Sequence, residues 1–478
     1  MKYIYLLALI LTNELYGQQY SFENKSKTEI WDLVDSLDQV IDKSPNSSEA
    51  YYYRYQCKKK LSVAVFAIKD LEKAIELNPS NYESLTDRGI HRWSRGDYSA
   101  ALVDLKKASS LKKDYVLPYL IKAQVYVKLD KFKEAILELD EAIKLAPDDY
   151  QALTTRGNFK IVIEDYLGAK SDFDRSITIK DDFLDSYRSR SRLREEILDY
   201  KGAIEDLNIV LSFDKKDVFS YNSRGYNKSQ LQDFKGSIED YSMAIKLNSE
   251  YMEAYYGRAL VKFGIKDYKS ALLDFNKSIQ LSDENRDPTI HLYSGYCKNE
   301  IKDYNGAIKE FDKVIKREPE NKKAYTNRGM SKYKLGDYKS ALKDMDFAIL
   351  IDSNYAQGFN KRGDVKRELN DLEGALKDLN RAIELDSTNP SGYNNRAAIK
   401  SKMNDDTGAI SDIEIAIKLA PELYLMYETA AVIYKESGNI KKSEEYYNLF
   451  LEKKKSSLLY QKWLLTNLSL DSTISSLY

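Results

Sequence analysis

A 34-residue period runs through most of this chain and constrains its fold more than any other feature. Counted from Ser48, seven copies of the pattern follow one another with this period. After a two-residue shift at Arg286–Asp287 it resumes at Pro288 and continues through five more. Twelve copies therefore cover Ser48–Ser457. A period of this length is typical of a solenoid, in which each unit buries its apolar face only against its neighbours.

Each copy has the pattern of two helices joined by a turn. In Lys322–Tyr355, apolar and small residues recur three and four apart on either side of a break at Gly336–Asp337, as one face of each of two helices requires. All eight prolines fall at copy boundaries, where they interrupt no helix. The inter-helix turn carries Asp in nine copies, which predicts an N-cap for the second helix. Repeat position 8 is Gly or Ala in ten copies and position 20 is Ala in ten, so we expect the two helices to approach closely there.

Charged residues also follow the period. Position 7 is Arg in nine copies, and position 23 of the same nine copies is Asp, as in Arg328 and Asp344. We interpret these as ion pairs between the two helices of one copy, which fix their register more than they add stability. A stripe of arginines that binds anions is the alternative.

These features together resemble the tetratricopeptide repeat family. The resemblance rests on the small–aromatic–small packing positions, the Gly-Asp-Tyr turn (Gly336–Tyr338) and the wording Tyr-x-x-Arg-Gly at Tyr325–Gly329. It implies an all-α fold, an α-solenoid of about twelve stacked 34-residue helix-turn-helix repeats wound into a right-handed superhelix. It also implies that the first helices line the concave side.

By the same resemblance, positions 2, 5, 9 and 12 of each first helix face the concave groove. These positions vary from copy to copy, so a partner would be recognised there. The candidate partner-binding residues are Trp93, Arg188, Arg192, Phe219, Tyr226, Tyr256, Phe263, Tyr296 and Tyr333. Exposed aromatic rings suit recognition because they bury a large area at low entropic cost. The alternative is that several of the rings pack between adjacent first helices. The family's clamp for chaperone tails is not supported, because Thr154 replaces the base expected beside Asn158.

The two ends differ from the repeats. Residues 1–17 have the pattern of a signal peptide, with Lys2 before a short apolar run, although an ordinary buried helix is the alternative. Residues 23–47 are expected to form an N-terminal capping helix, and residues 458–478 a C-terminal capping helix and tail. We therefore expect an exported protein, periplasmic or extracellular, with no integral membrane segment in the mature chain.

The sequence offers no set of residues for catalysis. The 74 basic and 75 acidic side chains nearly balance, which argues against a nucleic-acid partner. His91 and His291 are the only histidines, and Cys57 and Cys297 lie seven copies apart, so we expect no metal, no cofactor, no disulfide and no enzymatic activity. The leading hypothesis is a scaffold that binds protein or peptide segments in its groove. The alternatives are a structural subunit of an envelope or secretion assembly, and a carbohydrate-binding or enzyme-associated accessory protein.

Overall fold

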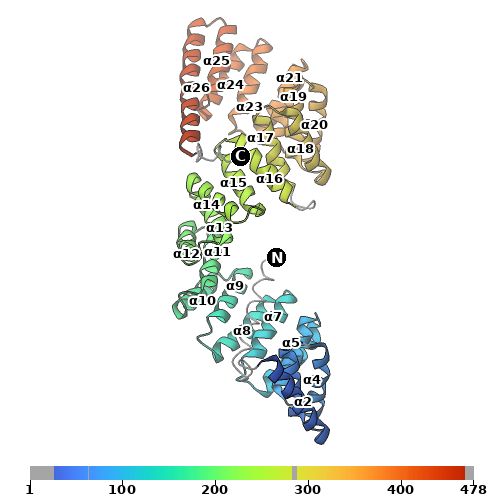
Figure 1. Cartoon of the computed structure of the whole chain (residues 1–478). Helices are drawn as coiled ribbons and strands as arrows, with labels where there is room; N and C mark the ends of the chain where they lie inside the picture. The colour runs from blue at the N-terminus through green and yellow to red at the C-terminus, as the bar shows by residue number, and fades with distance from the viewer. Residues whose placement is uncertain (1–25, 63, 283–287, 469–478) are drawn as a thin grey trace. The chain divides into compact units, whose positions relative to one another are not determined.

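The chain folds as an all-α solenoid built from pairs of antiparallel helices (Figure 1). The computed structural model describes residues 26–62, 64–282 and 288–468, and in that part of the chain it contains 25 helices and no strand. They form two compact units, Met1–Phe213 and Asp214–Tyr478. The helices of the first unit are α2 (Lys27–Lys43), α3 (Ser48–Lys60), α4 (Ala64–Leu77), α5 (Tyr82–Ser94), α6 (Tyr98–Leu111), α7 (Leu117–Lys128), α8 (Phe132–Leu145), α9 (Tyr150–Val162), α10 (Tyr166–Ile179), α11 (Leu184–Glu196) and α12 (Tyr200–Phe213).

The second unit continues the same alternation. Its helices are α13 (Val218–Gln230), α14 (Phe234–Leu247), α15 (Met252–Gly264), α16 (Tyr268–Leu281), α17 (Thr289–Glu300), α18 (Tyr304–Arg317), α19 (Lys322–Lys334), α20 (Tyr338–Ile351), α21 (Ala356–Glu368), α22 (Leu372–Leu385), α23 (Pro390–Lys402), α24 (Asp406–Leu419), α25 (Tyr424–Glu436) and α26 (Ile440–Leu468). The odd-numbered helices from α3 to α25 are the first helices of the twelve repeats, and each packs against the even-numbered helix that follows it. The predicted all-α solenoid is confirmed; its right-handed sense stays a prediction.

The turn between the two helices of a repeat has one conformation throughout. Repeat position 15 adopts a left-handed backbone in all twelve copies, with φ between 56° and 82°. Only three copies place glycine there, at Gly96, Gly336 and Gly438, and in the other nine a residue with a side chain holds the strained conformation. The next helix then begins with an Asp cap in nine copies, as predicted; the Asp337 carboxylate, for example, accepts the Ser340 amide.

Small residues set the distance between the two helices of a repeat. Alanine at position 20 is completely buried in all ten copies that carry it. A β-carbon on Gly329 would lie 3.2 Å from the carbonyl oxygen of Ala341 and 2.8 Å from the Met345 side chain. The glycines are therefore required by the close approach of the two backbones, which outweighs their cost of about 1 kcal/mol in a helix.

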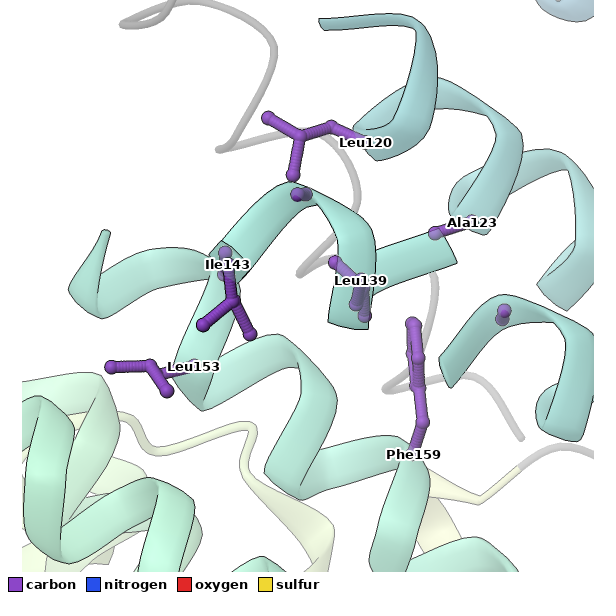
Figure 2. Close-up of a cluster of buried hydrophobic side chains, with 9 residues drawn as sticks. Leu120, Ala123, Leu139, Ile143, Leu153 and Phe159 are labelled. Atoms are coloured by element: carbon purple, nitrogen blue, oxygen red, sulfur yellow. The ribbon is translucent and has the colours of Figure 1, made fainter. Parts of the chain in front are cut away.

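Apolar side chains from two consecutive repeats share each core cluster, except one that joins α2 to the first repeat. Figure 2 shows one such cluster, in which Leu139 and Ile143 of α8 lie between residues of α7 and residues of α9 such as Leu153 and Phe159. No repeat buries its apolar surface alone, which is the packing expected of a solenoid.

Ion pairs join the two helices of a repeat on the same side in every copy that has the Arg–Asp pattern. The guanidinium of Arg328 makes two parallel hydrogen bonds to Asp344, and the other eight pairs do the same at 2.5–3.0 Å. The predicted pairing is thereby confirmed, and these arginines are committed to carboxylates rather than open to anions.

Two further contacts of this network were not anticipated. A second base, four residues after the arginine, reaches the same carboxylate, as Lys332 reaches Asp344 at 2.8 Å. The remaining guanidinium nitrogen of Arg328 reaches back to Asp312 in the preceding repeat at 2.7 Å. The same backward contact to an aspartate is made by Arg54, Arg156, Arg190 and Arg362. The network therefore joins neighbouring repeats as well as the two helices of each one.

The first described helix, α2, lies inside the segment 23–47 that the sequence analysis assigns to an N-terminal cap; its capping role stays a prediction. It begins with a capping box, in which Ser26 and Glu29 exchange side-chain and backbone hydrogen bonds. Residues 458–468 do not form a separate helix, because α26 continues without a break from Ile440 to Leu468. The predicted signal peptide at 1–17, residues 23–25 of the cap, the shift at 286–287 and the tail from 469 lie outside the described residues.

Candidate functional site: the inner surface of the first helices

The first helices of successive repeats lie closer to one another than the second helices do. α19 contacts α21, α21 contacts α23 and α23 contacts α25, and the same holds for α9 with α11. No two successive second helices are in comparable contact in the described part of the chain. Within each unit the first helices therefore lie on the inner side of the stack. We call repeat positions 2, 5, 9 and 12 of these helices the inner surface.

Two aromatic rings stand exposed on the inner surface of the second unit. Phe219 keeps 51% of its surface exposed and Tyr226 keeps 42%. Both belong to α13, and because they are seven residues apart they lie on the same face of the helix, two turns from each other. The Phe219 ring also meets Tyr251 edge to face, with centroids 5.5 Å apart. These two rings offer the most aromatic surface of the nine residues selected from the sequence.

The other four predicted aromatic residues of this unit are half-buried and serve partly as packing. Phe263 meets Tyr268 and Tyr293 at centroid distances of 5.6 and 5.3 Å, and it lies 6.3 Å from Tyr296. Burial raises the pKa of Tyr296 to about 12. These half-buried rings therefore form what we call the floor of the inner surface, in which they are packed against neighbouring side chains.

Two of these four rings also pack against side chains of the second helices. Tyr256 contacts the buried Phe275 with centroids 6.1 Å apart. Tyr333 lies 5.4 Å from Tyr338. Its hydroxyl donates to Glu368 at 3.3 Å and accepts from Arg367 at 3.4 Å. An alanine at either position would disturb packing as well as any partner.

The three predicted residues of the first unit have different surroundings. Trp93 is half-buried and packs against the core cluster that contains Leu105 and Val125. Arg188 is half-buried and donates to Asp185 in the same helix at 2.7 Å. Arg192 is exposed, and its guanidinium donates a 2.8 Å hydrogen bond to the side-chain oxygen of Asn158 in the preceding repeat. The surrounding protein still lowers the pKa of the Arg192 guanidinium by desolvating it.

Polar bonds between successive first helices form a feature that the sequence analysis missed. Ser331 donates to Asn299 at 2.7 Å, and Asn395 donates to Asn360 at 2.9 Å. Ser401 donates to Glu436 at 2.6 Å. The partners in these bonds are 32 to 35 residues apart, close to one period. A search for hydrogen-bonding side chains about one repeat apart along the whole of the first helices could have found them.

The described side chains include possible metal ligands and two cysteine thiols. They contain no group of three or more His, Cys, Asp or Glu side chains that could hold a metal ion. Cys57 and Cys297 are buried free thiols, and burial raises the pKa of each, to about 12 for Cys297, so neither is an activated nucleophile. Over the same residues no helix has the length and apolar character needed to span a bilayer.

Models of known protein families match several of the repeats. Models described as "TPR repeat" and "Tetratricopeptide repeat" match residues 363–404, 92–157 and 291–321. A model described as "Anaphase-promoting complex subunit 5" matches residues 219–302. No curated protein matches the chain.

Several solved structures are similar to this chain over part or most of its length. The TPR protein YrrB is 20% identical, covering 39% of this chain and 95% of its own, with a TM-score of 0.35. Yeast Tom70 is 16% identical, covering 82% of this chain and 97% of its own, with a TM-score of 0.41. A tetratricopeptide repeat protein from Parabacteroides merdae is 18% identical, covering 57% of this chain and 100% of its own, with a TM-score of 0.39.

The 34-residue period, the stacked helix pairs and the matched family models all indicate the same family. The chain is a tetratricopeptide repeat protein. As such it is a protein-interaction scaffold by class, and the family is generally non-catalytic.

Proposed function

We propose that this chain is a non-catalytic scaffold that binds an extended segment of a partner protein along the inner surface of its first helices. The observation that carries the proposal is the pair of exposed rings at Phe219 and Tyr226 on one face of α13, at positions that vary between repeats. A partner side chain that covers them removes apolar area from water, at about 25 cal/mol per Å². The proposal includes export from the cytoplasm, on the strength of the pattern in residues 1–17.

Cross-linking from defined positions tests the proposal. The experiment is done in the cells that make the protein. A photo-reactive amino acid is placed at Tyr226 or Ser229 on the inner surface, or at Val103 or Leu137 on the second helices, which we call the outer surface. We expect adducts with a partner protein from the inner positions. Adducts from the outer positions alone would contradict the proposal.

Substitution gives the matching functional test. Phe219→Ala combined with Tyr226→Ala should weaken recovery of the cross-linked partner at least tenfold while leaving the melting temperature nearly unchanged, because both rings are exposed. Leu273→Ala combined with Leu350→Ala serves as the control, since it removes two exposed apolar side chains from second helices of the same unit and leaves the inner surface intact.

One observation favours a second candidate, in which the outer surface joins a larger assembly. Val103 and Leu137 occupy the same position of consecutive second helices, α6 and α8, and are 66% and 64% exposed. A structural subunit would use such a surface. The outer cross-linking positions distinguish this candidate from the first.

A further inference from the structure

The last repeat exposes a face that the other repeats of the second unit bury. From α14 to α24, each second helix is covered by the first helix of the next repeat, and the side chain at repeat position 24 lies in that contact. These side chains are at most 4% exposed: Tyr241, Phe275, Phe311, Met345, Leu379 and Ile413. In the last repeat Tyr447 holds position 24 and is 51% exposed. No helix of the described chain follows α26, which stands beside α25 at the end of the second unit (Figure 1).

Six exposed side chains run along this face of α26. Their spacing alternates between four and three residues, and the four apolar ones keep 47–61% of their surface exposed. We call these six the end stripe: Ile440, Glu444, Tyr447, Leu451, Lys454 and Leu458. Side chains at this spacing share one face of a helix and form the seam along which a second helix packs. The end stripe therefore has the pattern of a contact between helices.

The end stripe differs from the face that takes a following repeat. Position 21 is Ile or Leu in the other six repeats of the second unit, whereas Glu444 holds it here. Lys454 and Leu458 belong to the stripe only because α26 continues past position 30, where the other second helices of this unit end. The charge at position 21 and the greater length of α26 both indicate a partner other than a further repeat.

The end stripe is complementary to a second copy of itself. When two copies of one helix pack antiparallel about a twofold axis, residues at equal distances from the axis face each other. For an axis at the level of Leu449 the facing pairs lie nine, two and five residues from it, and they are Ile440 with Leu458, Tyr447 with Leu451, and Glu444 with Lys454. Every apolar member then meets an apolar one, and each carboxylate meets an ammonium group. In a parallel, in-register pairing, by contrast, each charged residue would face its own copy.

The two charged members of the stripe are available for these contacts. Neither Glu444 nor Lys454 forms an ion pair with a described residue, and the Lys454 ammonium lies 4.9 Å from the centre of the Phe450 ring. Exposed ion pairs add little to affinity, but opposite charges select one orientation and like charges disfavour the others. The four apolar side chains supply the affinity, because the pairing removes them from water.

We propose that the end stripe of α26 binds the end stripe of a second copy of this chain, antiparallel and centred on Leu449. The same surface of both copies forms the contact, so the assembly closes as a dimer and does not grow into a filament. The stripe from Ile440 to Leu458 is about 27 Å long at 1.5 Å per residue. This inference goes beyond the proposed function and does not depend on it, because the inner-surface rings of α13 take no part in the contact.

Analytical ultracentrifugation of the purified protein tests the inference through an exchange of charges. We expect the native protein to form a dimer. Glu444→Lys and Lys454→Glu each place like charges opposite each other at two points of the interface, so each should weaken the dimer at least tenfold. The two changes together restore both pairs with their signs exchanged and should recover the native affinity.

A matched control shows that the position of the charge matters. Glu445→Lys makes the same change of charge at an exposed residue that points away from the end stripe, so it should leave the dimer unchanged. All the substituted positions are exposed, so the variants should keep the native melting temperature, which thermal unfolding measures.

Three results would overturn the inference. A native protein that is monomeric at every concentration would leave the end stripe to a different protein. A dimer that survives both single changes would use another surface. A combined Glu444→Lys and Lys454→Glu variant that dimerises no better than the single variants would exclude the antiparallel register.

The two proposals fail in different ways. If the charge exchange behaves as expected but Tyr226 gives no cross-links, the dimer stands and the inner-surface scaffold does not. If the charge exchange has no effect while Tyr226 still gives cross-links, the scaffold stands and the dimer does not.

Discussion

Arg328 and Asp344 face each other across α19 and α20 through two parallel hydrogen bonds of 2.6 and 3.0 Å. The carboxylate is nearly fully buried, with 4% of its side chain exposed. Geometry of this kind makes the pair costly to break, because removal of one partner leaves a buried charge that the other contacts compensate only in part.

A double-mutant cycle on this pair should give a clear coupling energy. Arg328→Gln should lower the free energy of unfolding by about 2–3 kcal/mol, less than a fully isolated charge would, because Lys332 still reaches Asp344. Asp344→Asn combined with Arg328→Gln should cost less than the sum of the two single changes. Urea unfolding followed by circular dichroism measures the cycle. A coupling near zero would mean that the pair does not hold the helix register.

Repeat eight offers a pH-dependent test of the same network. Glu310 is buried, which by itself raises its pKa, but hydrogen bonds from His291, Lys298 and Lys313 outweigh burial and lower the pKa to about 2, from an ordinary 4.5. The folded state therefore binds the proton less readily than the unfolded state. The resulting stabilisation, about 3 kcal/mol, is fully present above pH 4.5 and is lost as the pH falls towards 2.

The Glu310→Gln variant isolates that contribution. The difference in unfolding free energy between the native chain and the variant should be largest at pH 6 and should shrink steadily between pH 4.5 and pH 2.5. Equilibrium urea unfolding at a series of pH values measures it. A difference that stays constant over this range would show that Glu310 is not held in its charged form.

A pair of glycines tests the close approach of the helices. A β-carbon on Gly295 would lie 2.6 Å from the ring of Phe311, which is completely buried and has no room to move. Gly295→Ala should therefore destabilise the second unit by about 1–3 kcal/mol. Gly264→Ala, in the same unit, meets nothing within 4 Å and should stabilise it by up to about 1 kcal/mol through helix propensity. Thermal unfolding of the two variants compares them, and a loss in both would argue against the steric explanation.

The left-handed turn predicts a stabilising substitution. Leu198 holds φ at 62° with 69% of its surface exposed, at the repeat position that Gly336 fills elsewhere. Leu198→Gly should raise the free energy of unfolding by about 1 kcal/mol, because glycine adopts this conformation without steric cost. Gly336→Leu should have the opposite effect. Calorimetry on both variants decides, and an unchanged or lower midpoint for Leu198→Gly would refute the strain argument.

Local periodicity was enough to predict most of the fold. The spacing of Gly329 and Ala341 predicted the tight helix pair, and the constant spacing of Arg328, Asp344 and their counterparts predicted the contact between them. The contact of Lys332 with the same carboxylate was not predicted. The lysine recurs at a regular spacing, but spacing alone does not show that three charged groups meet at one point. The backward contact to Asp312 depends on how neighbouring repeats stack, which no single copy determines.

The sequence predicted which repeat positions form the inner surface, but not how deeply each side chain there is buried. Phe219 and Phe263 both fall at inner positions, yet the first is exposed while the second packs among neighbouring rings. The difference depends on which side chains the adjacent first helix supplies, Tyr293 in the second case. Asn158 and Arg192 were each singled out from the sequence for separate reasons, but their bond required knowledge that equivalent positions one period apart come within hydrogen-bond distance.

The backward contact of the position-7 arginine has a consequence for how such a chain can change in evolution. Arg156, Arg190, Arg328 and Arg362 each bind one carboxylate in their own repeat and another in the repeat before it. Because the buried aspartate belongs to the same repeat as its arginine, removal or duplication of one whole internal module keeps every buried pair together. A gene for this protein could lose or gain a module by recombination between copies without stranding a buried charge. A change in length inside a helix would shift the arginine relative to its partner, whereas the two-residue shift at 286–287 falls between two repeats.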